Sequence, residues 1–428
     1  MTFNFEEGQG NFDDHPLFGW VRELRRDFHR HPEVGFEETR TAEKIREILS
    51  QLGVPLVAAP EAPTGVVGCI QGGQPGPTIG VRADIDALPM QEAADKPYAS
   101  KYAGRMHACG HDAHTAILLG VARSLMTSGR MDDMPGRVKL IFQPAEETLG
   151  GAKTMVASRV MENPHIDAMV ALHVSNQYPL GTIGLPREYA YAAADWFDLK
   201  IHGRGVHAAM PHRGVDPIMA GVNLYQGFQS IVSRRVNPAD VLVLSVSRFI
   251  AGDAPNIIPD EAFLAGTLRY FKSAVRTMAR EQVDRLIEGV ERGFGVKVDL
   301  NYTAATCPVK NDAAIVALIQ NAAAEIVGEE KITNAEPTTG SEDFSEYLKY
   351  APGAMLFLGS RAPDSKERQP AHSPTFDIDE RCLPLGIEIM TRICLDFLSQ
   401  RCDRSVFKTT SRKKRQPEQH FNNCIGRR

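Results

Sequence analysis

Two successive patterns of apolar and polar positions, called the first and the second order below, run along this chain. The first order predicts helices that alternate with strands. The stretches with apolar residues three and four apart, which predict helices, are 17–30, 39–52 and 112–126. The short apolar runs between turn residues, which predict buried strands, are 78–83, 138–142 and 168–173. We expect Asp112 to cap the third helix. Strands separated by helices predict an α/β fold, with a mostly parallel sheet covered by helices.

The second order begins near residue 190 and predicts a separate unit. Its predicted elements are a strand at 196–203, a helix at 217–236, strands at 241–250 and 261–271, a helix at 273–293 and a strand at 296–306. This β-α-β-β-α-β order is that of a ferredoxin-like α+β unit. Because the first order resumes afterwards, the unit is expected to be an insertion. The predicted division is a catalytic domain in two segments, 1–186 and 304–402, an inserted domain at 187–303 and a tail at 403–428.

Composition places the chain among ordinary globular proteins. Of its 428 residues, 43% are hydrophobic and 24% are charged, and no apolar run approaches the ~18 residues that a membrane span needs. The first residues carry no basic start followed by an apolar stretch, so no secretory signal is predicted. Seven cysteines, an odd number spread widely, do not indicate a disulfide framework. We therefore expect a cytoplasmic protein that does not bind a membrane.

Charge is distributed unevenly. Residues 403–428 hold eight Lys or Arg against two acidic residues, a net charge of +6, so the chain before them carries about −11 of the total of −5. An acidic body argues against nucleic-acid binding. The basic run at 412–415 has no apolar periodicity, and a solvated, disordered tail is the interpretation that its composition favours.

Two compact motifs contain candidates for metal ligands and for a general base. Cys109 and His111 stand just before the third predicted helix, whose amino end favours the metal-binding thiolate form of a cysteine. Glu146 and Glu147 follow a strand that Pro144 ends, so one carboxylate can bind an ion while the other faces a water. A buried structural cysteine and a pair of solvated loop acids are the alternatives.

Other candidates lie where predicted strands end. His173 closes one apolar run, Asp84 and Asp86 follow another, and His372 lies in a loop beside a proline. Asp86 is suited to orient a ligand histidine through its ring N–H. A core histidine, a turn acid and an exposed loop histidine are the alternatives for single positions. Since the carboxyl ends of parallel strands meet at one edge, the joint placement favours a metal site. For His107 and His114 we expect supporting or packing roles.

Longer motifs extend over nearly the whole chain. They are His29-Arg30-His31-Pro32-Glu33, Gly35-Phe36-Glu37-Glu38, Arg82 through Pro89, Met106 through Thr115, Phe142 through Glu147, Gly150-Gly151-Ala152, Gly203 through His212, Gly340 through Phe344, and His372-Ser373-Pro374. With them the chain resembles the dinuclear metal-dependent amidohydrolases that include hippurate hydrolase, N-acyl-L-amino-acid amidohydrolases and indole-3-acetyl-amino-acid hydrolases. These are relatives of aminoacylase and of zinc carboxypeptidases. The resemblance implies a zinc-peptidase-like catalytic domain with an inserted lid or dimerisation domain.

The resemblance also implies a site for two divalent metal ions. The ligands that it implies are Cys109, His111, Glu147, His173 and His372. Glu146 is then the general base, which takes a proton from a water that the two ions bridge. A cysteine ligand favours a borderline or soft ion such as Zn²⁺ over Mg²⁺ or Ca²⁺, and Mn²⁺, Co²⁺ and Ni²⁺ stay open.

Four residues toward or within the inserted domain receive expected roles from the same resemblance. His207 is expected to reach the scissile carbonyl across the interface of a homodimer formed through the inserted domain. Asn256, Arg269 and Gly340 are expected to bind the substrate. An Arg guanidinium suits a substrate carboxylate because it can donate two parallel hydrogen bonds, although a surface salt bridge is an equally good account of Arg269.

The function expected from these features is hydrolysis of the amide bond of small N-acyl amino acids to a carboxylic acid and a free amino acid. A dipeptidase, or a deacetylase of an N-acetyl or N-succinyl biosynthetic intermediate, is the alternative among enzymes. A metal-dependent binding protein without turnover is the alternative outside enzymes, and the intact Glu146 beside the ligands argues against it.

Overall fold

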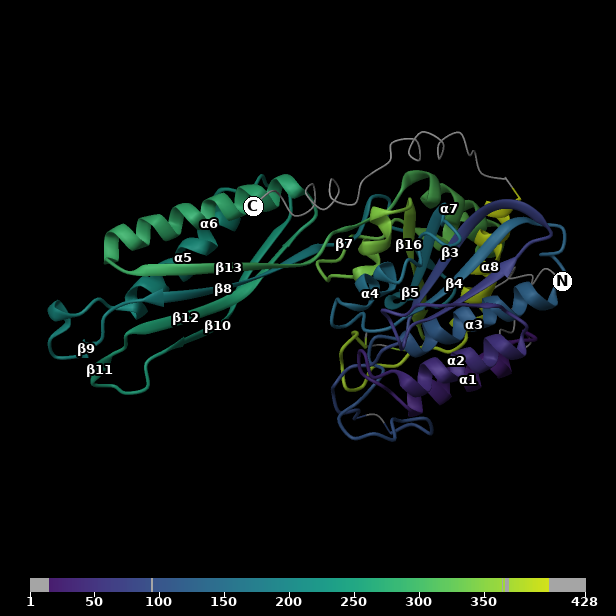
Figure 1. The fold of residues 1–428 in the computed structure, drawn as a ribbon, viewed down its shortest axis with the longest axis horizontal. Coiled ribbons are helices and arrows are strands. Elements are labelled where there is room, and N and C mark those ends of the chain that lie inside the picture. The colour runs from purple at the N-terminus through teal and green to yellow at the C-terminus, as the bar shows by residue number, and fades with distance from the viewer. Residues whose placement is uncertain (1–14, 94, 364, 366–368, 400–428) are drawn as a thin grey trace. The chain divides into compact units, whose positions relative to one another are not determined.

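The apolar runs predicted as buried strands form the centre of one sheet. In the computed structural model, which describes residues 15–93, 95–363, 365 and 369–399, four strands lie side by side and parallel (Figure 1). In spatial order they are β4 (Pro135–Gln143), β3 (Gln74–Asp84), β5 (Ala168–Pro179) and β16 (Gly353–Arg361). Because both faces are covered, these strands are largely buried: β5 and β16 are mainly apolar on both sides, whereas β3 and β4 carry polar side chains such as Arg82 and Lys139 on one side.

Shorter strands extend this sheet to eight, in the order β1-β2-β4-β3-β5-β16-β6-β15. They are β1 (Leu56–Val57), β2 (Val66–Gln71), β6 (Ile183–Gly184) and β15 (Ile332–Thr333). β2 pairs antiparallel with β4, and β6 pairs antiparallel with β16. The predicted mostly parallel sheet is therefore confirmed for the central strands, and the edges make it mixed.

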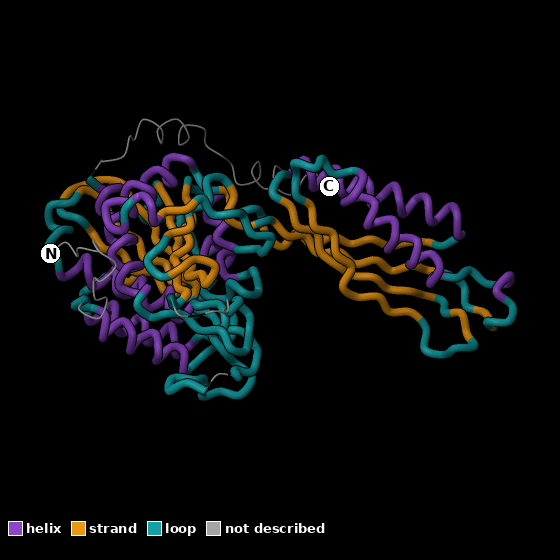
Figure 2. The backbone as a smooth tube through the Cα atoms, turned by 180° about the vertical axis from the view of Figure 1, so that it is seen from behind, coloured by secondary structure: helices purple, strands orange, loops and turns teal. Residues whose placement is uncertain are grey.

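Helices cover the sheet, and Figure 2 shows them around the strands. One group contributes side chains to the main core: α1 (Phe18–Arg30), α2 (Thr39–Gln51), α3 (His111–Thr127), α7 (Ala313–Val327) and α8 (Cys382–Leu398). Two short elements that contact β4 and β5, α4 (Gly151–Ala157) and the 3₁₀ helix η4 (Asp343–Lys349), pack against each other. Successive side chains of β4 point to opposite faces of the sheet. Val138, Leu140 and Phe142 therefore belong to the main core, and Lys139 does not.

Two local predictions were wrong. The third helix begins at His111 and is capped by Gly110, whose φ is 96°, and not by Asp112. Asp112 is the second residue of this helix, and its Oδ2 accepts hydrogen bonds from Arg25 and His29. His173 does not close its strand, because β5 continues to Pro179.

The second order of elements forms a four-stranded antiparallel sheet under two helices. The strands, in the spatial order β10-β12-β8-β13, are β10 (Leu242–Ala251), β12 (Glu261–Tyr270), β8 (Ala193–His202) and β13 (Lys297–Thr306). The helices α5 (Pro217–Arg234) and α6 (Ser273–Phe294) share a core with it. Asp216 caps α5 by accepting hydrogen bonds from the Ile218 and Met219 amides. This strand order is that of the predicted ferredoxin-like unit.

The described residues divide into two compact units. The catalytic unit holds 15–190, 309–336 and 343 onward, and the inserted unit holds 191–308 together with the short segment 337–342. The predicted catalytic segments had included 337–342. The predicted tail at 403–428 lies outside the described residues. None of the helices in the described part of the chain has both the length and the apolar character that crossing a membrane requires.

Lys139 explains how one loop of the catalytic unit is held. Its side chain is fully buried in β4, and its ammonium donates to the carbonyls of Val160, Asn163 and Pro164 at 2.5, 3.0 and 3.1 Å. A buried charge is tolerated only with such partners. The loop after α4 is therefore tied to the sheet through one side chain.

We expect Lys139→Met to destabilise the protein by roughly 2–4 kcal/mol, because three buried carbonyls lose their donor. The measurement is the midpoint of urea unfolding followed by circular dichroism. Lys153→Met, at an exposed position of α4, is the control and should change stability by less than about 0.5 kcal/mol. An equal effect of both substitutions would contradict this account.

Candidate metal centre and catalytic site

The five predicted metal ligands come together at the ends of the central strands. β3 and β4 end level with each other, with Asp84 opposite Gln143. Arg82 lies opposite Ala171 on β5, so His173, two residues further on, is level with these ends. Turns and loops after the strands, and the start of α3, supply the remaining candidates.

Their ligand atoms form two groups of three. Within each group, the atoms lie within 4.8 Å of one another. One group is Cys109, His111 and His173, and the other is Cys109, Glu147 and His372. The two groups share the Cys109 thiol, so five side chains offer two adjacent positions for a cation.

Hydrogen bonds orient the two buried histidines of this cluster. The His173 Nδ1 donates to the Val174 carbonyl at 2.7 Å, and its Nε2 lies 3.5 Å from the Cys109 Sγ. The His111 Nδ1 lies 2.9 Å from the Asp86 carbonyl oxygen. The His111 Nε2 is buried and makes no hydrogen bond within the described residues. Since one nitrogen is engaged by an oxygen, each ring directs Nε2 toward the cluster, as ligand histidines do.

Asp86 connects two of the predicted ligands. Its Oδ1 lies 3.2 Å from the His111 Nδ1, and its Oδ2 accepts a hydrogen bond from the Glu147 amide at 3.0 Å. This buried carboxylate therefore touches the ring of one predicted ligand and the backbone of another. The contacts are those of the orienting role expected for Asp86.

Electrostatics of the cluster favour a protonated thiol and act differently on its histidines. Burial raises the pKa of Cys109 to about 12, and the nearby Glu147 carboxylate adds to the increase. The expectation that the helix amino end favours the thiolate was wrong for the protein alone, because burial outweighs it. Burial and the neighbouring His114 lower the pKa of His173 to about 3. Burial opposes protonation of the His111 ring, but the Asp84 carboxylate and further neighbours outweigh burial and hold the pKa of His111 well above its usual value, and the hydrogen bond to Glu147 raises the pKa of His372. Thiolate, imidazole and carboxylate form a donor set that fits a borderline cation, whose charge would favour loss of these protons.

The general base candidate Glu146 is buried beside these ligands. A carboxylate oxygen of Glu146 lies within 4.8 Å of ligand atoms of His111 and Glu147. The preceding residue, Ala145, has a φ of 50°, which is uncommon for a residue with a Cβ. The turn therefore holds an unusual backbone conformation immediately before the two glutamates.

Glu38 supports this turn, and no role was assigned to it from the sequence. Its Oε1 accepts a hydrogen bond from the Ala145 amide at 2.8 Å, and its Oε2 accepts one from the Thr64 hydroxyl at 2.8 Å. Burial raises the pKa of Glu38 to about 7. The sequence signal for Glu38 is the motif Gly35-Phe36-Glu37-Glu38. Spacing alone does not predict its contact with a turn more than 100 residues away.

His114, one of the two histidines that flank the ligands, is held by other groups. In His114, Nδ1 donates to Asp84 at 2.6 Å and Nε2 accepts from the Val174 amide at 2.9 Å, so neither nitrogen is directed at a cation.

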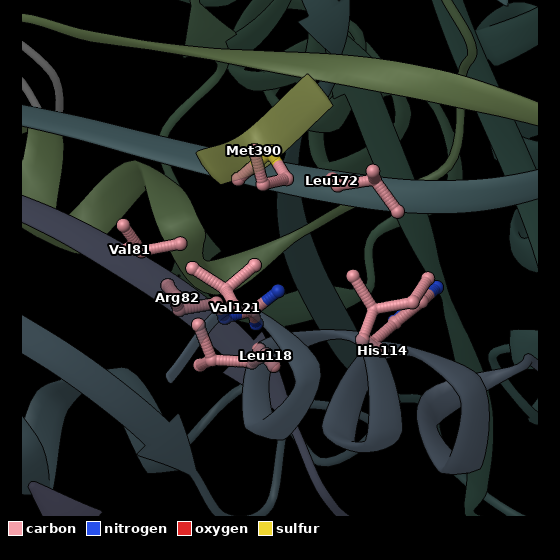
Figure 3. Close-up of a pocket in the computed structure, with 9 residues that line it drawn as sticks. Val81, Arg82, His114, Leu118, Val121, Leu172 and Met390 are labelled. Carbon is pink, nitrogen blue, oxygen red and sulfur yellow. The ribbon is translucent and has the colours of Figure 1, made fainter. Parts of the chain in front are cut away.

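A small, mainly apolar cavity lies beside His114, lined by Leu118 of α3 and Met390 of α8 among others (Figure 3). None of the five predicted ligands lines this cavity, so it is a packing feature apart from the cluster.

In the inserted unit, His207 and Asn256 lie together. β9 (Val206–His207) pairs with β11 (Ile257–Ile258), and the Ala208 amide donates to the Asn256 carbonyl at 3.0 Å. The exposed His207 ring accepts a hydrogen bond from the Ala209 amide at Nδ1, at 3.1 Å. A ring that accepts at Nδ1 carries its proton on Nε2, which leaves Nε2–H as a donor.

Arg269 and Gly340 lie at the other end of the same unit. Arg269 is next to the last residue of β12, and its Nη1 donates to the Ser341 hydroxyl at 2.7 Å. His207 and Asn256 lie toward the opposite end of β12, beyond its first residue, Glu261. The 10 residues of β12 extend roughly 30 Å at about 3.4 Å per residue. The structure therefore brings the four predicted residues together as two pairs, far apart.

Comparisons with known proteins agree with these features. A model of peptidase family M20/M25/M40 matches residues 80–396. The chain is 36% identical over 372 residues to an N-acetylcysteine deacetylase of Bacillus subtilis, covering 87% of this chain and 95% of that protein. It is 36% identical over 393 residues to an IAA-amino acid hydrolase of Arabidopsis thaliana, covering 89% and 86%.

A solved structure is also similar over its whole length. It is that of a Bacillus subtilis protein described as a dinuclear metal binding peptidase from the M20 family, with a TM-score of 0.79 and 33% identity, covering 90% of this chain and 99% of that one. The family resemblance, the fold class and the assignment to hydrolytic enzymes made from the motifs are confirmed by these matches.

We expect the stability of the protein to decrease as pH rises from about 5 to about 8, because folding holds a proton on Glu38. The unfolded pKa is 4.5 and the folded pKa is about 7, so this contribution is complete below 4.5 and lost as pH passes 7. In Glu38→Gln the amide oxygen can accept from the Ala145 amide while the amide nitrogen donates to the Thr64 hydroxyl, so both contacts are kept without a charge. At pH 8 it should be more stable than the wild type, by at most about 3 kcal/mol.

The measurement is the midpoint of urea unfolding at several pH values between 5 and 8. Glu43→Gln, on an exposed position of the same helix α2, is the matched control and should keep the pH dependence of the wild type. Parallel pH profiles for the wild type and Glu38→Gln would show that Glu38 does not hold the proton.

Proposed function

Since the chain belongs to peptidase family M20/M25/M40, we propose that it is a metal-dependent amidohydrolase that cleaves N-acyl amino acids into a carboxylic acid and a free amino acid. The single observation that carries the proposal is the pair of ligand groups that share Cys109, with a buried glutamate, Glu146, beside them. The names of the relatives, which include a deacetylase of N-acetylcysteine and a hydrolase of IAA-amino acids, support N-acyl amino acids as the substrate class.

In this proposal two divalent ions are held by Cys109, His111, Glu147, His173 and His372. The oriented imidazoles and the cysteine thiolate suit a borderline ion such as Zn²⁺, Co²⁺ or Ni²⁺ better than Mg²⁺ or Ca²⁺, and Mn²⁺ stays open. When bound, the ions lower the pKa of a water and polarise the amide carbonyl. Asp86 keeps the His111 ring and the Glu147 backbone in place for them.

Glu146 acts as the general base. It accepts the proton of the attacking water and passes that proton to the nitrogen of the leaving amino acid. The turn that Glu38 holds at Ala145 fixes the direction of this carboxylate.

His207 is proposed to donate its Nε2–H to the developing oxyanion, an effect typically worth about 3–4 kcal/mol for one donor. Arg269, Asn256 and Gly340 are proposed to bind the substrate, with Arg269 on its carboxylate. The scissile acyl carbonyl of an N-acyl amino acid is a few bonds from its carboxylate, whereas His207 and Arg269 lie toward opposite ends of β12 in one chain. We therefore propose that His207 serves the site of a second copy in a homodimer.

The surface of the inserted unit supports this dimer. Along α5, five large apolar side chains are exposed: Ile218, Met219, Val222, Tyr225 and Val232. β10 is an edge strand of the sheet and exposes Phe249 and Ile250. An unpaired strand edge beside an apolar helix face suits pairing with an identical surface.

A second function within the same chemistry is deacetylation of an N-acetyl or N-succinyl intermediate, or dipeptide hydrolysis. The N-acetylcysteine deacetylase among the relatives favours the N-acetyl group.

The cytoplasm is the proposed location. Cys69, Cys109, Cys382 and Cys394 are thiols in the structure, which fits a reducing compartment.

The test of the substrate class is amino-acid release from N-acetyl, N-benzoyl and indole-acetyl amino acids and from dipeptides. Protein stripped of metal and reloaded with Zn²⁺, Mn²⁺ or Co²⁺ is expected to release amino acid, and stripped protein is not. No release with any ion from any acyl amino acid would overturn the proposal.

Glu146→Gln is expected to reduce kcat by a factor of about 10²–10⁴, because the general base is lost, while two metal ions stay bound. Glu147→Gln, one residue away, should instead lower the metal content. Elemental analysis and steady-state kinetics on the same samples separate the two effects. Full turnover in Glu146→Gln would sink its role as base.

Mixing two inactive variants tests the shared site. If His207 serves the partner's site, His207→Ala combined with Glu146→Gln gives mixed dimers with one complete site. After reversible dissociation, an equimolar mixture is then expected to regain roughly a quarter of wild-type activity, since random pairing makes half of the dimers mixed. Neither variant alone should regain activity. A mixture that stays inactive, although mixed dimers form, would place His207 in the site of its own chain.

A further inference from the structure

A buried charge cluster lies next to the ligands in the catalytic unit, and no role in the reaction has been given to it. Its centre is the guanidinium of Arg25 on α1, whose side chain is completely buried. The guanidinium donates to the carboxylates of Asp112 and Asp377 at 2.8 Å each, and to Glu380 at 3.2 Å. One planar cation therefore joins α1, the start of α3 and the segment before α8.

Two of these carboxylates belong to segments that carry predicted ligands. Asp112 directly follows His111 at the start of α3. Asp377 lies five residues after His372, in the stretch of residues 369–378 between the described strands and α8, which we call the His372 loop. Arg25 thus ties the part of the site that holds His111 to the loop that holds His372.

Asp377 anchors the His372 loop through both its side chain and its backbone. Its Oδ2 accepts a hydrogen bond from the Tyr98 hydroxyl at 2.7 Å and lies 3.4 Å from the Lys96 ammonium. Its carbonyl accepts from the Asn176 side chain, on β5, at 2.8 Å. Burial opposes ionisation of this carboxyl, but Arg25 and Lys96 hold its pKa below the usual value. Side chain and backbone of one residue therefore fasten the loop to several elements.

His372 lies close to a second fastened point of this loop, since the Ala93 amide donates to the Pro374 carbonyl at 2.9 Å. The loop has no helix or strand at this point, and the residue adopts a φ of 62°. Its amide donates to the Ala108 carbonyl at 2.7 Å, and its side chain is 53% exposed. The imidazole Nε2 lies 3.3 Å from a Glu147 oxygen. The place of this ring therefore depends on where the loop backbone is held.

We propose that Asp377 is a positioning residue for metal binding: held by Arg25 and Tyr98, it fixes the His372 loop against α3 and so places the His372 imidazole beside Cys109 and Glu147. The inference rests on the proposed function, in which His372 is a metal ligand. Asp377 touches neither metal nor substrate, and it acts only through the position of another side chain.

The test is a double-mutant cycle on zinc affinity, measured by competition with a chromophoric chelator. His372→Ala should weaken one of the two bound equivalents. Asp377→Asn keeps the shape but loses the charge that Arg25 holds, and it should weaken the same equivalent by about 10–100-fold, as substitutions behind a ligand typically do. In the His372→Ala background, Asp377→Asn should change that affinity by less than about threefold, because the imidazole that Asp377 positions is absent.

Glu380→Gln is the matched control, because Glu380 also accepts from Arg25 but lies eight residues after His372, next to Arg381, the N-cap of α8. It should leave zinc affinity unchanged in both backgrounds. If Asp377→Asn does not fold, as judged by circular dichroism, Tyr98→Phe removes one hydrogen bond to Asp377 and should give the same cycle at smaller size. Equal weakening by Asp377→Asn in both backgrounds would overturn this inference alone. Unchanged affinity in His372→Ala would overturn the ligand assignment, and this inference with it.

Discussion

The level alignment of three parallel strands is the constraint on which the rest of the site depends. β3 and β4 end opposite each other, and His173 on β5 lies at the same level. Ladder hydrogen bonds fix this register, and a slip of one residue would turn every side chain of a strand to the other face. The ligands are separated by up to about 260 residues in sequence, so only the sheet brings them within a few ångströms of one another.

A second requirement follows from burying so many charges beside these strand ends. Arg82 donates to Asp84 at 2.7 Å and to Asp343 at 3.2 Å, and Asp84 in turn accepts from His114. An unpaired charge in such surroundings would cost several kcal/mol. Each carboxylate is therefore satisfied by a neighbour, and the chain of contacts continues through the His114 ring to the Val174 amide. The same pairing that makes the charges tolerable also fixes the directions of the groups around the ligands.

The sequence was most informative where a pattern is local. The alternation of buried and exposed residues in the inserted unit led to its β-α-β-β-α-β order, and compact motifs led to the five residues that the structure brings together. Helix α8 was missed because it is buried along nearly its whole length, so no polar face marks it. Asp112 was misread as a helix cap because its partners, Arg25 and His29, are more than 80 residues away. Glu38 and Asp377 escaped for the same reason, since their contacts depend on tertiary packing and not on spacing.

The inserted unit shows why catalysis and association are coupled in the proposed mechanism. Its four antiparallel strands are held by continuous ladders, so β12 keeps a nearly fixed length between the His207 end and Arg269. Movement of the unit as a rigid body changes where both residues lie but not the distance between them. A substrate that Arg269 holds by its carboxylate therefore leaves the His207 of the same chain out of reach of its carbonyl. In the proposed mechanism the donor would then come from another copy, and the exposed apolar face of α5 and the open edge of β10 would serve catalysis as well as stability.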